Sequence, residues 1–164
     1  MKTVKELMTG AVVTTAPEAS LKDVAVLMRE HDVGFVPVVG NEKVVGLITD
    51  RDLVTRGLAD GLAADVRVRD IATPTVRTIH EEETLDTLAD AMKAKNLRRF
   101  VVLDAEERPV GVVALGDVAH RGDAGTAGTV LKEISSPSKP MRVDERTAAR
   151  PAFARIVAGD VEAR

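Results

Sequence analysis

The strongest constraint on the fold of this chain is an internal repeat in its sequence. The segment Val4–Thr9 (VKELMT) aligns with Val68–Thr73 (VRDIAT) at an offset of 64 residues. The same offset pairs Glu18, Leu21, Ala25 and Met28 with Glu82, Leu85, Ala89 and Met92. Matches spread evenly over ~55 positions indicate a duplicated unit. A period of this length is too long for one unit of a solenoid, so we interpret it as two copies of a small α/β module.

The sequence of each copy predicts a short turn of helix followed by the element order β-α-β-β-α. Apolar residues at helical spacing predict one long helix per copy, over Leu21–His31 and over Leu85–Lys95. Ser20 and Thr84 precede these helices and suit their N-caps. The other expected elements are helical turns at Val4–Met8 and Val68–Ile71, strands at Val12–Thr14, Phe35–Val39, Val44–Ile48, Val76–Thr78, Arg99–Leu103 and Pro109–Val113, and second helices that begin near Thr49 and Leu115.

The size of one copy predicts how the two are arranged. A unit of ~60 residues is marginal alone, because it buries only ~60% of its unfolded surface. We therefore expect an α/β (α+β) fold in which two tandem modules, residues 1–62 and 63–122, pack sheet to sheet with pseudo-twofold symmetry. Such packing creates two equivalent clefts, and clefts at junctions are common sites for small ligands.

The segment after the second copy is expected to be less regular. Residues 123–139 are interpreted as a linker and a short closing helix over Val130–Ile134. Within this region Gly122–Gly128 lacks the Gly-Lys-Ser/Thr that would follow in a phosphate-binding loop, so we interpret it as a linker. Residues 140–164 are charged and poor in large apolar side chains, which is typical of a flexible tail.

The composition excludes several classes of protein. The chain contains no cysteine, tryptophan or tyrosine, and it has three phenylalanines. Disulfides and cysteine-ligated zinc are therefore excluded, and single-stranded bases have no aromatic platform to stack on. The formal net charge of −3 argues against a nucleic-acid binder. No apolar run approaches the ~20 residues of a membrane span, and we expect a soluble, cytoplasmic protein.

Catalytic and metal sites are also not indicated by the sequence. His31, His80 and His120 lack the spacing of metal ligands, so no metal or other cofactor is expected. No hydrolytic triad or redox centre emerges, nor does a pair of groups suited to acid–base catalysis. We therefore expect no enzymatic activity.

The two copies share one motif, at the junction between the last strand and the second helix. The first copy has Gly46-Leu-Ile-Thr-Asp-Arg-Asp52, and the second has Gly111-Val-Val-Ala-Leu-Gly-Asp117. A glycine, two aliphatic residues, a hydroxyl residue and an aspartate three further on resemble the signature of the CBS domain. Together with the repeat, this makes residues 1–120 similar to a CBS pair, or Bateman module. The stretch Thr49–Leu62 is similar to stand-alone bacterial CBS pairs, some of which are induced by hypoxia or stress.

The resemblance implies clefts that bind adenosine-containing ligands such as AMP, ADP, ATP, NAD or S-adenosylmethionine. A carboxylate can accept charge-assisted hydrogen bonds from both ribose hydroxyls. By resemblance, Thr49 and Asp52 hold phosphate and ribose in one cleft, while Asp117 holds ribose in the other. Arg51 could add the positive charge that a di- or triphosphate needs. The residues expected to border the base are Thr14, Phe35, Thr78 and Phe100.

A purely structural interpretation fits the same residues. Thr49-x-x-Asp52 is also a capping box, in which the threonine caps the helix and the aspartate bonds back to it. Asp117 lies in a first helical turn, where the helix dipole favours a negative charge. Both interpretations remain open at the level of the sequence.

The second copy departs from the family pattern at two positions. Ala114 stands where a serine or threonine would supply a hydroxyl to phosphate, and Val101 stands where the first copy has Pro37. The second cleft could thus prefer a nucleoside, hold a ligand weakly or be empty. Arg98, with Arg99, could compensate by reaching toward phosphate, but a solvated corner between helix and strand is the favoured interpretation of this pair.

The leading hypothesis is a regulatory sensor of adenine nucleotides, in which ligand occupancy changes shape or affinity for a regulated protein partner. By resemblance we expect a homodimer, formed through the aliphatic outer faces of the helices. The alternative is a homodimeric interaction scaffold that works without ligand and has its clefts filled by side chains.

Overall fold

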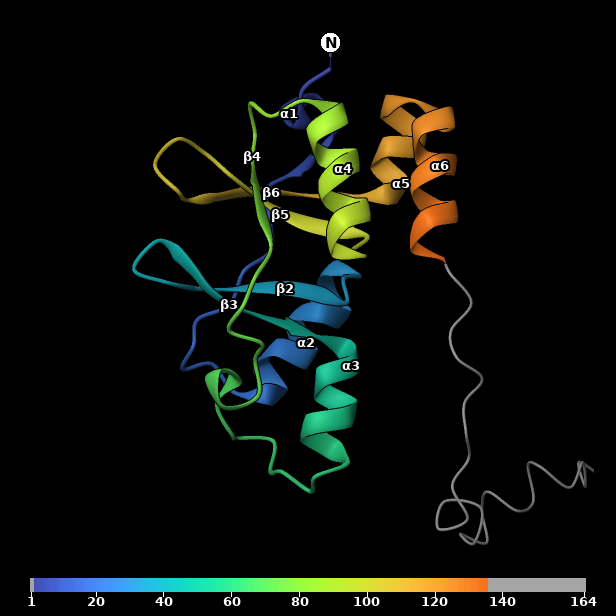
Figure 1. Ribbon diagram of the computed structural model, residues 1–164. Helices are drawn as coiled ribbons and strands as arrows, with labels where there is room; N and C mark the ends of the chain where they lie inside the picture. Colours follow the sequence, from blue (N-terminus) through green and yellow to red (C-terminus); the bar gives the residue numbers. More distant parts are fainter. Residues whose placement is uncertain (1, 136–164) are drawn as a thin grey trace, which may run out of the picture. The chain divides into compact units, whose positions relative to one another are not determined.

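Two β-sheets carry the fold of residues 2–135, the part of the chain that the computed structural model describes (Figure 1). One sheet has four strands in the order β1-β6-β5-β4, and the other pairs β2 with β3. The pairs β1–β6, β5–β6 and β2–β3 are antiparallel, and β4–β5 is parallel. The strands are β1 Thr9–Gly10, β2 Phe35–Gly40, β3 Lys43–Thr49, β4 Thr78–His80, β5 Arg99–Leu103 and β6 Pro109–Ala114.

The helices follow the two copies of the repeat. The two long helices of the copies, α2 and α4, occupy the predicted ranges Leu21–His31 and Leu85–Lys95. Their N-caps are Ser20 and Thr84, each of which accepts a hydrogen bond from a backbone amide of the first turn. The remaining helices are α1 Val4–Leu7, α3 Asp50–Asp52 with its π-helical continuation η1 Leu53–Leu58, the 3-10 turn η2 Val68–Asp70, α5 Leu115–Asp117 with its π-helical continuation η3 Val118–Gly122, and α6 Ala124–Ile134.

The prediction of strands at Val12–Thr14 and Val76–Thr78 is wrong in position. In the first copy the pairing falls on Thr9–Gly10, and Ala11 then adopts a φ of 53° that ends it. Pairing resumes at Thr15, which bridges Val38. In the second copy the strand begins two residues later, at Thr78.

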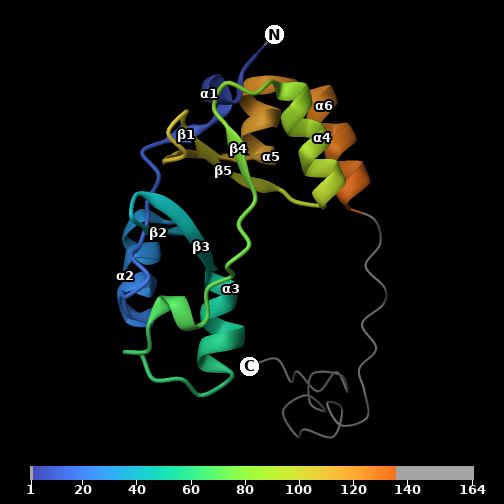
Figure 2. The same cartoon turned by 60° about the vertical axis from the view of Figure 1, so that its left-hand side comes forward.

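The prediction of a linker at Gly122–Gly128 is also wrong, because α6 begins at Ala124. Asp123 caps this helix: its Oδ2 accepts hydrogen bonds from Thr126 N at 2.7 Å and from Thr126 Oγ1 at 2.6 Å. Ala127, Val130 and Ile134 of α6 are buried in the core that contains α4, and Figures 1 and 2 show the two helices side by side. The expected tail at 140–164 lies outside the described residues.

The hydrophobic interior has two parts, one for each copy. The first contains Leu21, Val24, Met28, Val36, Val38 and Ile48. The second contains Ile79, Leu88, Ala89, Met92, Phe100, Val102, Val113 and Val118, together with the buried face of α6. Together with the two sheets, these cores confirm the predicted α+β fold of two tandem modules.

The helical turn in front of each copy packs into the core of the other copy. Val4 and Leu7 of α1 are fully buried in the second core, whereas Val68 and Ile71 are buried in the first. The backbone repeats this exchange, since Val4 N donates to Glu83 O at 2.8 Å and Val68 N donates to Ala19 O at 2.8 Å. Figure 2 accordingly shows α1 beside β4 of the second copy. The pseudo-twofold symmetry therefore extends to the connecting segments.

Candidate functional site

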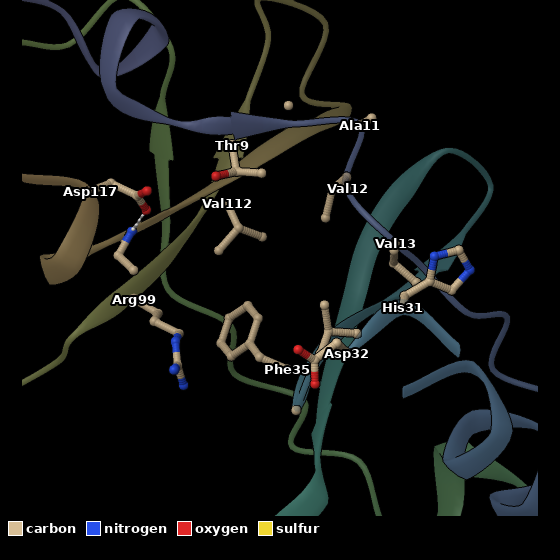
Figure 3. Close-up of a pocket in the computed structure, with 14 residues that line it drawn as sticks. Thr9, Ala11, Val12, Val13, His31, Asp32, Phe35, Arg99, Val112 and Asp117 are labelled. Carbon is tan, nitrogen blue, oxygen red and sulfur yellow. Dashed lines mark hydrogen bonds between the residues drawn. The ribbon is translucent and has the colours of Figure 1, made fainter. Parts of the chain in front are cut away.

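A cavity of about 420 Å³ lies between the two copies, and we call it the Asp117 cavity (Figure 3). The N-terminal segment Thr9–Val13 and the end of α2 with the start of β2, His31–Phe35, form one part of its wall. The sheet of the second copy and the start of α5 form the other part, through Arg99, Val112, Ala114 and Asp117. The site therefore depends on elements far apart in the sequence.

The walls of the Asp117 cavity are apolar on several sides. Figure 3 shows the ring of Phe35 and the side chains of Val12 and Val112 around the hollow. Phe35 is half-buried at the start of β2, opposite Thr49 of β3. A flat ring system placed here would gain contact with an aromatic face and with aliphatic side chains.

Asp117 supplies the negative charge inside this cavity. Its Oδ2 accepts a hydrogen bond from Ala114 N at 2.8 Å, and this bond caps the start of α5. Within residues 2–135 that is the one hydrogen bond or ion pair of its carboxylate. The carboxylate can therefore accept further hydrogen bonds, as recognition of two vicinal hydroxyls requires.

Polar side chains that are exposed to solvent also line the cavity. Arg99 on β5, together with His31 and Asp32 at the end of α2, is exposed and lines it. A guanidinium offers several N–H donors to a phosphate or carboxylate. No group of three His, Cys, Asp or Glu side chains that could hold a metal ion is found among the described residues.

Asp52, the counterpart of Asp117 in the first copy, has a different environment. Its Oδ2 accepts hydrogen bonds from Thr49 N at 3.0 Å and from Thr49 Oγ1 at 2.6 Å, and its Oδ1 lies 3.5 Å from Arg56 Nε. The capping interpretation of Thr49 and Asp52 is thus confirmed. We call Thr49, Asp52, Arg56 and Thr73 the Asp52 site.

The structure brings together two of the residues predicted for ligand binding, Phe35 and Asp117, in one cavity. Thr78 lines a separate cavity of about 400 Å³ with residues such as Lys43 and Leu103. Thr49 and Asp52 belong to the Asp52 site. The remaining three polar residues, Thr14, Arg51 and Arg98, are exposed at the surface.

Phe100, which was expected to border the base, does not line the Asp117 cavity. Phe100 is 3% exposed and packs in the second core. Successive strand residues point to opposite faces, so its neighbour Arg99 faces the cavity instead. The repeat could have predicted that Phe100 is buried and that Arg99 faces the cavity, because the offset of 64 pairs Phe35 with Arg99 and the buried Val36 with Phe100.

Sequence reasoning also missed most of the cavity wall. Thr9, Val12, Val13, His31 and Asp32 line it without belonging to the motif that the copies share, and Val112 lies within that motif but was not predicted to line a cleft. What these residues share is their location at the junction between the two copies of the repeat. A pairwise comparison of the copies could not show which of them meet in space.

Comparison with known proteins identifies the same modules. A family model described as the CBS domain matches residues 4–58 and again residues 68–123. Hypoxic response protein 1 of Mycobacterium tuberculosis is 30% identical over 139 residues, which cover 84% of this chain and 96% of that protein. No helix within residues 2–135 is long and apolar enough to cross a membrane.

Solved structures similar to this chain include complexes with adenosine-containing ligands. The structure of CBSX2 in complex with AMP has a TM-score of 0.63 and 25% identity, and covers 73% of this chain and 94% of its own. The CBS domain pair of MJ0100, in complex with 5′-methylthioadenosine and S-adenosyl-L-methionine, has a TM-score of 0.63 and 28% identity. That match covers 72% of this chain and 97% of the MJ0100 pair.

Proposed function

Because this chain belongs to the CBS-domain family and carries two such domains in tandem, we propose that it is a regulatory protein that binds an adenosine-containing ligand in the Asp117 cavity. One observation carries the proposal: a carboxylate with remaining hydrogen-bonding capacity and the Phe35 ring line the same cavity of about 420 Å³. The ligands to be considered are AMP, ADP, ATP, NAD and S-adenosylmethionine.

The residues of the cavity suit the parts of such a ligand. The Asp117 carboxylate would accept hydrogen bonds from the two ribose hydroxyls. The adenine would lie against Phe35, with Val12 and Val112 completing an apolar slot. Arg99 would donate to a phosphate, which compensates for the missing hydroxyl at Ala114. The two neighbours solved with AMP, and with 5′-methylthioadenosine and S-adenosyl-L-methionine, support this ligand class.

The position of the cavity supports a regulatory role. Both copies contribute to its wall, so a bound ligand contacts both at once. A ligand shifts a conformational equilibrium by its difference in affinity for the two states. Occupancy would thereby alter the arrangement of the two copies and the affinity for a protein partner, without catalysis.

A thermal-shift panel tests this proposal. AMP, ADP, ATP, NAD and S-adenosylmethionine are compared with GMP and GTP, each with and without magnesium. A ligand at about one hundred times its Kd adds about 2.7 kcal/mol, and we expect a rise in the unfolding midpoint of about 5–10 °C for a chain of this size. Guanine nucleotides should give a smaller shift. The proposal fails if no adenosine compound moves the midpoint of the folded protein.

The scaffold alternative draws on an exposed apolar surface of the first copy. Val54, Leu58 and Leu62 are 57%, 76% and 39% exposed. Beside them Leu21, Ala25 and Leu53 line a shallow groove between α2 and η1. We propose that this surface pairs two copies of the chain in a homodimer, because burying it removes apolar area from water. Such a dimer is compatible with ligand binding and with a scaffold alone.

Replacing Leu58 with aspartate is expected to weaken a homodimer by about a hundredfold, because the most exposed apolar side chain of the surface becomes a charge that must be buried. The measurement is the molar mass by light scattering across a dilution series. Leu131→Asp on α6 is the matched control, since Leu131 is also an exposed leucine, at 46%. A dimer that dissociates equally in both variants, or in neither, contradicts the proposed surface.

A further inference from the structure

The Asp52 site is related to the Asp117 cavity by the repeat, but its carboxylate is already engaged. Asp52 is 65 residues before Asp117, and Thr73 is 64 residues after Thr9, which lines the cavity. Both oxygens of Asp52 have partners: Thr49 contacts Oδ2, and Arg56 lies 3.5 Å from Oδ1. The Asp52 side chain is 14% exposed, so little water competes for these positions.

Arg56 is fixed in place by the segment that precedes the second copy. Its Nη1 donates to Ile71 O at 3.0 Å and to Thr73 Oγ1 at 3.1 Å. Nε faces the Asp52 carboxylate at the same time. The guanidinium thus joins Asp52 to Thr73, the two residues whose counterparts Asp117 and Thr9 face a ligand-sized space.

The corresponding arginine of the second copy behaves differently. Arg121 is 65 residues after Arg56, and its Nη1 donates to Leu7 O at 3.1 Å and to Met8 O at 2.8 Å. Leu7 is the counterpart of Ile71, so the first of these contacts is shared by the two copies. The second contact differs, because Arg121 donates to Met8 O whereas Arg56 donates to the Thr73 hydroxyl. Among the described residues Arg121 forms no ion pair with Asp117.

We propose that Arg56 is an internal competitor for ligand at the Asp52 site: its guanidinium occupies the carboxylate that a ribose would need, so that the two halves bind adenosine compounds with unequal affinity. This inference rests on the proposed function. Arg56 is 50% exposed, and ion pairs with an exposed partner are weak. The competition therefore lowers the affinity of the Asp52 site without abolishing it.

The experiment isolates the Asp52 site by using Asp117→Ala as the background. Binding of adenosine, which carries no phosphate that Arg56 could attract, is measured by calorimetry or by ligand-observed NMR. Adding Arg56→Gln to this background is expected to tighten adenosine binding by about threefold to tenfold, because the guanidinium no longer forms an ion pair with the Asp52 carboxylate.

Three further variants in the same background serve as controls. Arg56→Lys keeps the positive charge beside Asp52 and is expected to tighten binding less than Arg56→Gln does. Arg121→Gln removes the counterpart arginine, which contacts main-chain carbonyls, and should leave the affinity within about twofold. Thr73→Val removes one anchor of Arg56 and should act in the same direction as Arg56→Gln, which provides a second test if Arg56→Gln is poorly folded.

The outcomes separate this inference from the proposed function. Unchanged or weaker adenosine binding after Arg56→Gln, in a variant whose urea midpoint shows that it is folded, overturns the competition. Equal gains from Arg56→Gln and Arg121→Gln overturn it as well. Neither result contradicts the proposed function. That function is tested by the binding of adenosine compounds to the unmodified chain and by the loss of this binding in Asp117→Ala.

Discussion

Replacing Asp117 with alanine is expected to weaken the binding of an adenosine compound by at least about a hundredfold. A hydrogen bond to a charged group contributes about 1.5–3 kcal/mol, and two ribose hydroxyls would lose their shared acceptor. Each 1.4 kcal/mol corresponds to about a tenfold change in Kd. Titration calorimetry with the best ligand of the thermal-shift panel measures the effect. The conservative Asp117→Asn variant should retain part of the affinity, because an amide oxygen still accepts a hydrogen bond.

A control for Asp117→Ala must also remove a carboxylate that caps a helix, because the loss of the cap lowers stability by itself. Asp117 caps α5 through Ala114 N, so its loss also costs about 1 kcal/mol of stability. Asp23 plays a comparable part at α2, where its Oδ2 accepts from Ser20 N at 3.2 Å, and it does not line the cavity. Asp23→Ala should lower stability and leave the ligand affinity unchanged. Equal loss of affinity in both variants would assign the effect to stability rather than to ribose recognition.

Replacing Gly111 with alanine is expected to lower the free energy of unfolding by about 2–3 kcal/mol, since an overpacked contact forces neighbouring atoms to move. A β-carbon on Gly111 would lie 2.8 Å from Thr9 O and 2.7 Å from Met8 Sδ. The methionine can rotate away, but the carbonyl belongs to β1, which pairs with β6 at this position. Urea unfolding followed by circular dichroism measures the change.

Gly46, the counterpart of Gly111 in the first copy, provides the matched control. A β-carbon there would meet Thr73 O at 3.4 Å and Ala72 Cβ at 3.5 Å, which are close but tolerable contacts. We expect Gly46→Ala to lower the free energy of unfolding by less than about 1 kcal/mol. Similar losses in the two variants would mean that the glycines are required for backbone freedom and not for the approach of β1 to β6.

The sequence predicted the elements whose signals are local. The ranges of α2 and α4 agree with the prediction because an N-cap, an apolar stripe and a left-handed residue at the end, Asp32 or Asn96, mark each helix. The strand β5 was likewise predicted in its full extent. Its partner β6 differs from the prediction by one residue at its end.

The predictions that failed depend on contacts between distant segments. The pairing of Thr9–Gly10 with β6 joins residues about one hundred positions apart, and nothing local indicates it. Gly125 and Gly128 favoured the prediction of a linker where α6 begins. The helix is stabilised instead by the burial of Ala127, Val130 and Ile134 and by the Asp123 cap. The engagement of Asp52 by Arg56 likewise appears only when η1 is placed beside Thr73.

The exchange of the helical turns gives the segment Thr9–Val13 an additional importance. It is part of the segment that connects α1, which is buried in the second core, with α2, which is buried in the first. The same five residues form part of the wall of the Asp117 cavity. A ligand that displaced this segment would change the packing of both cores together, because close-packed interiors transmit strain. Under the proposed function, this segment would connect occupancy of the Asp117 cavity to both copies of the repeat.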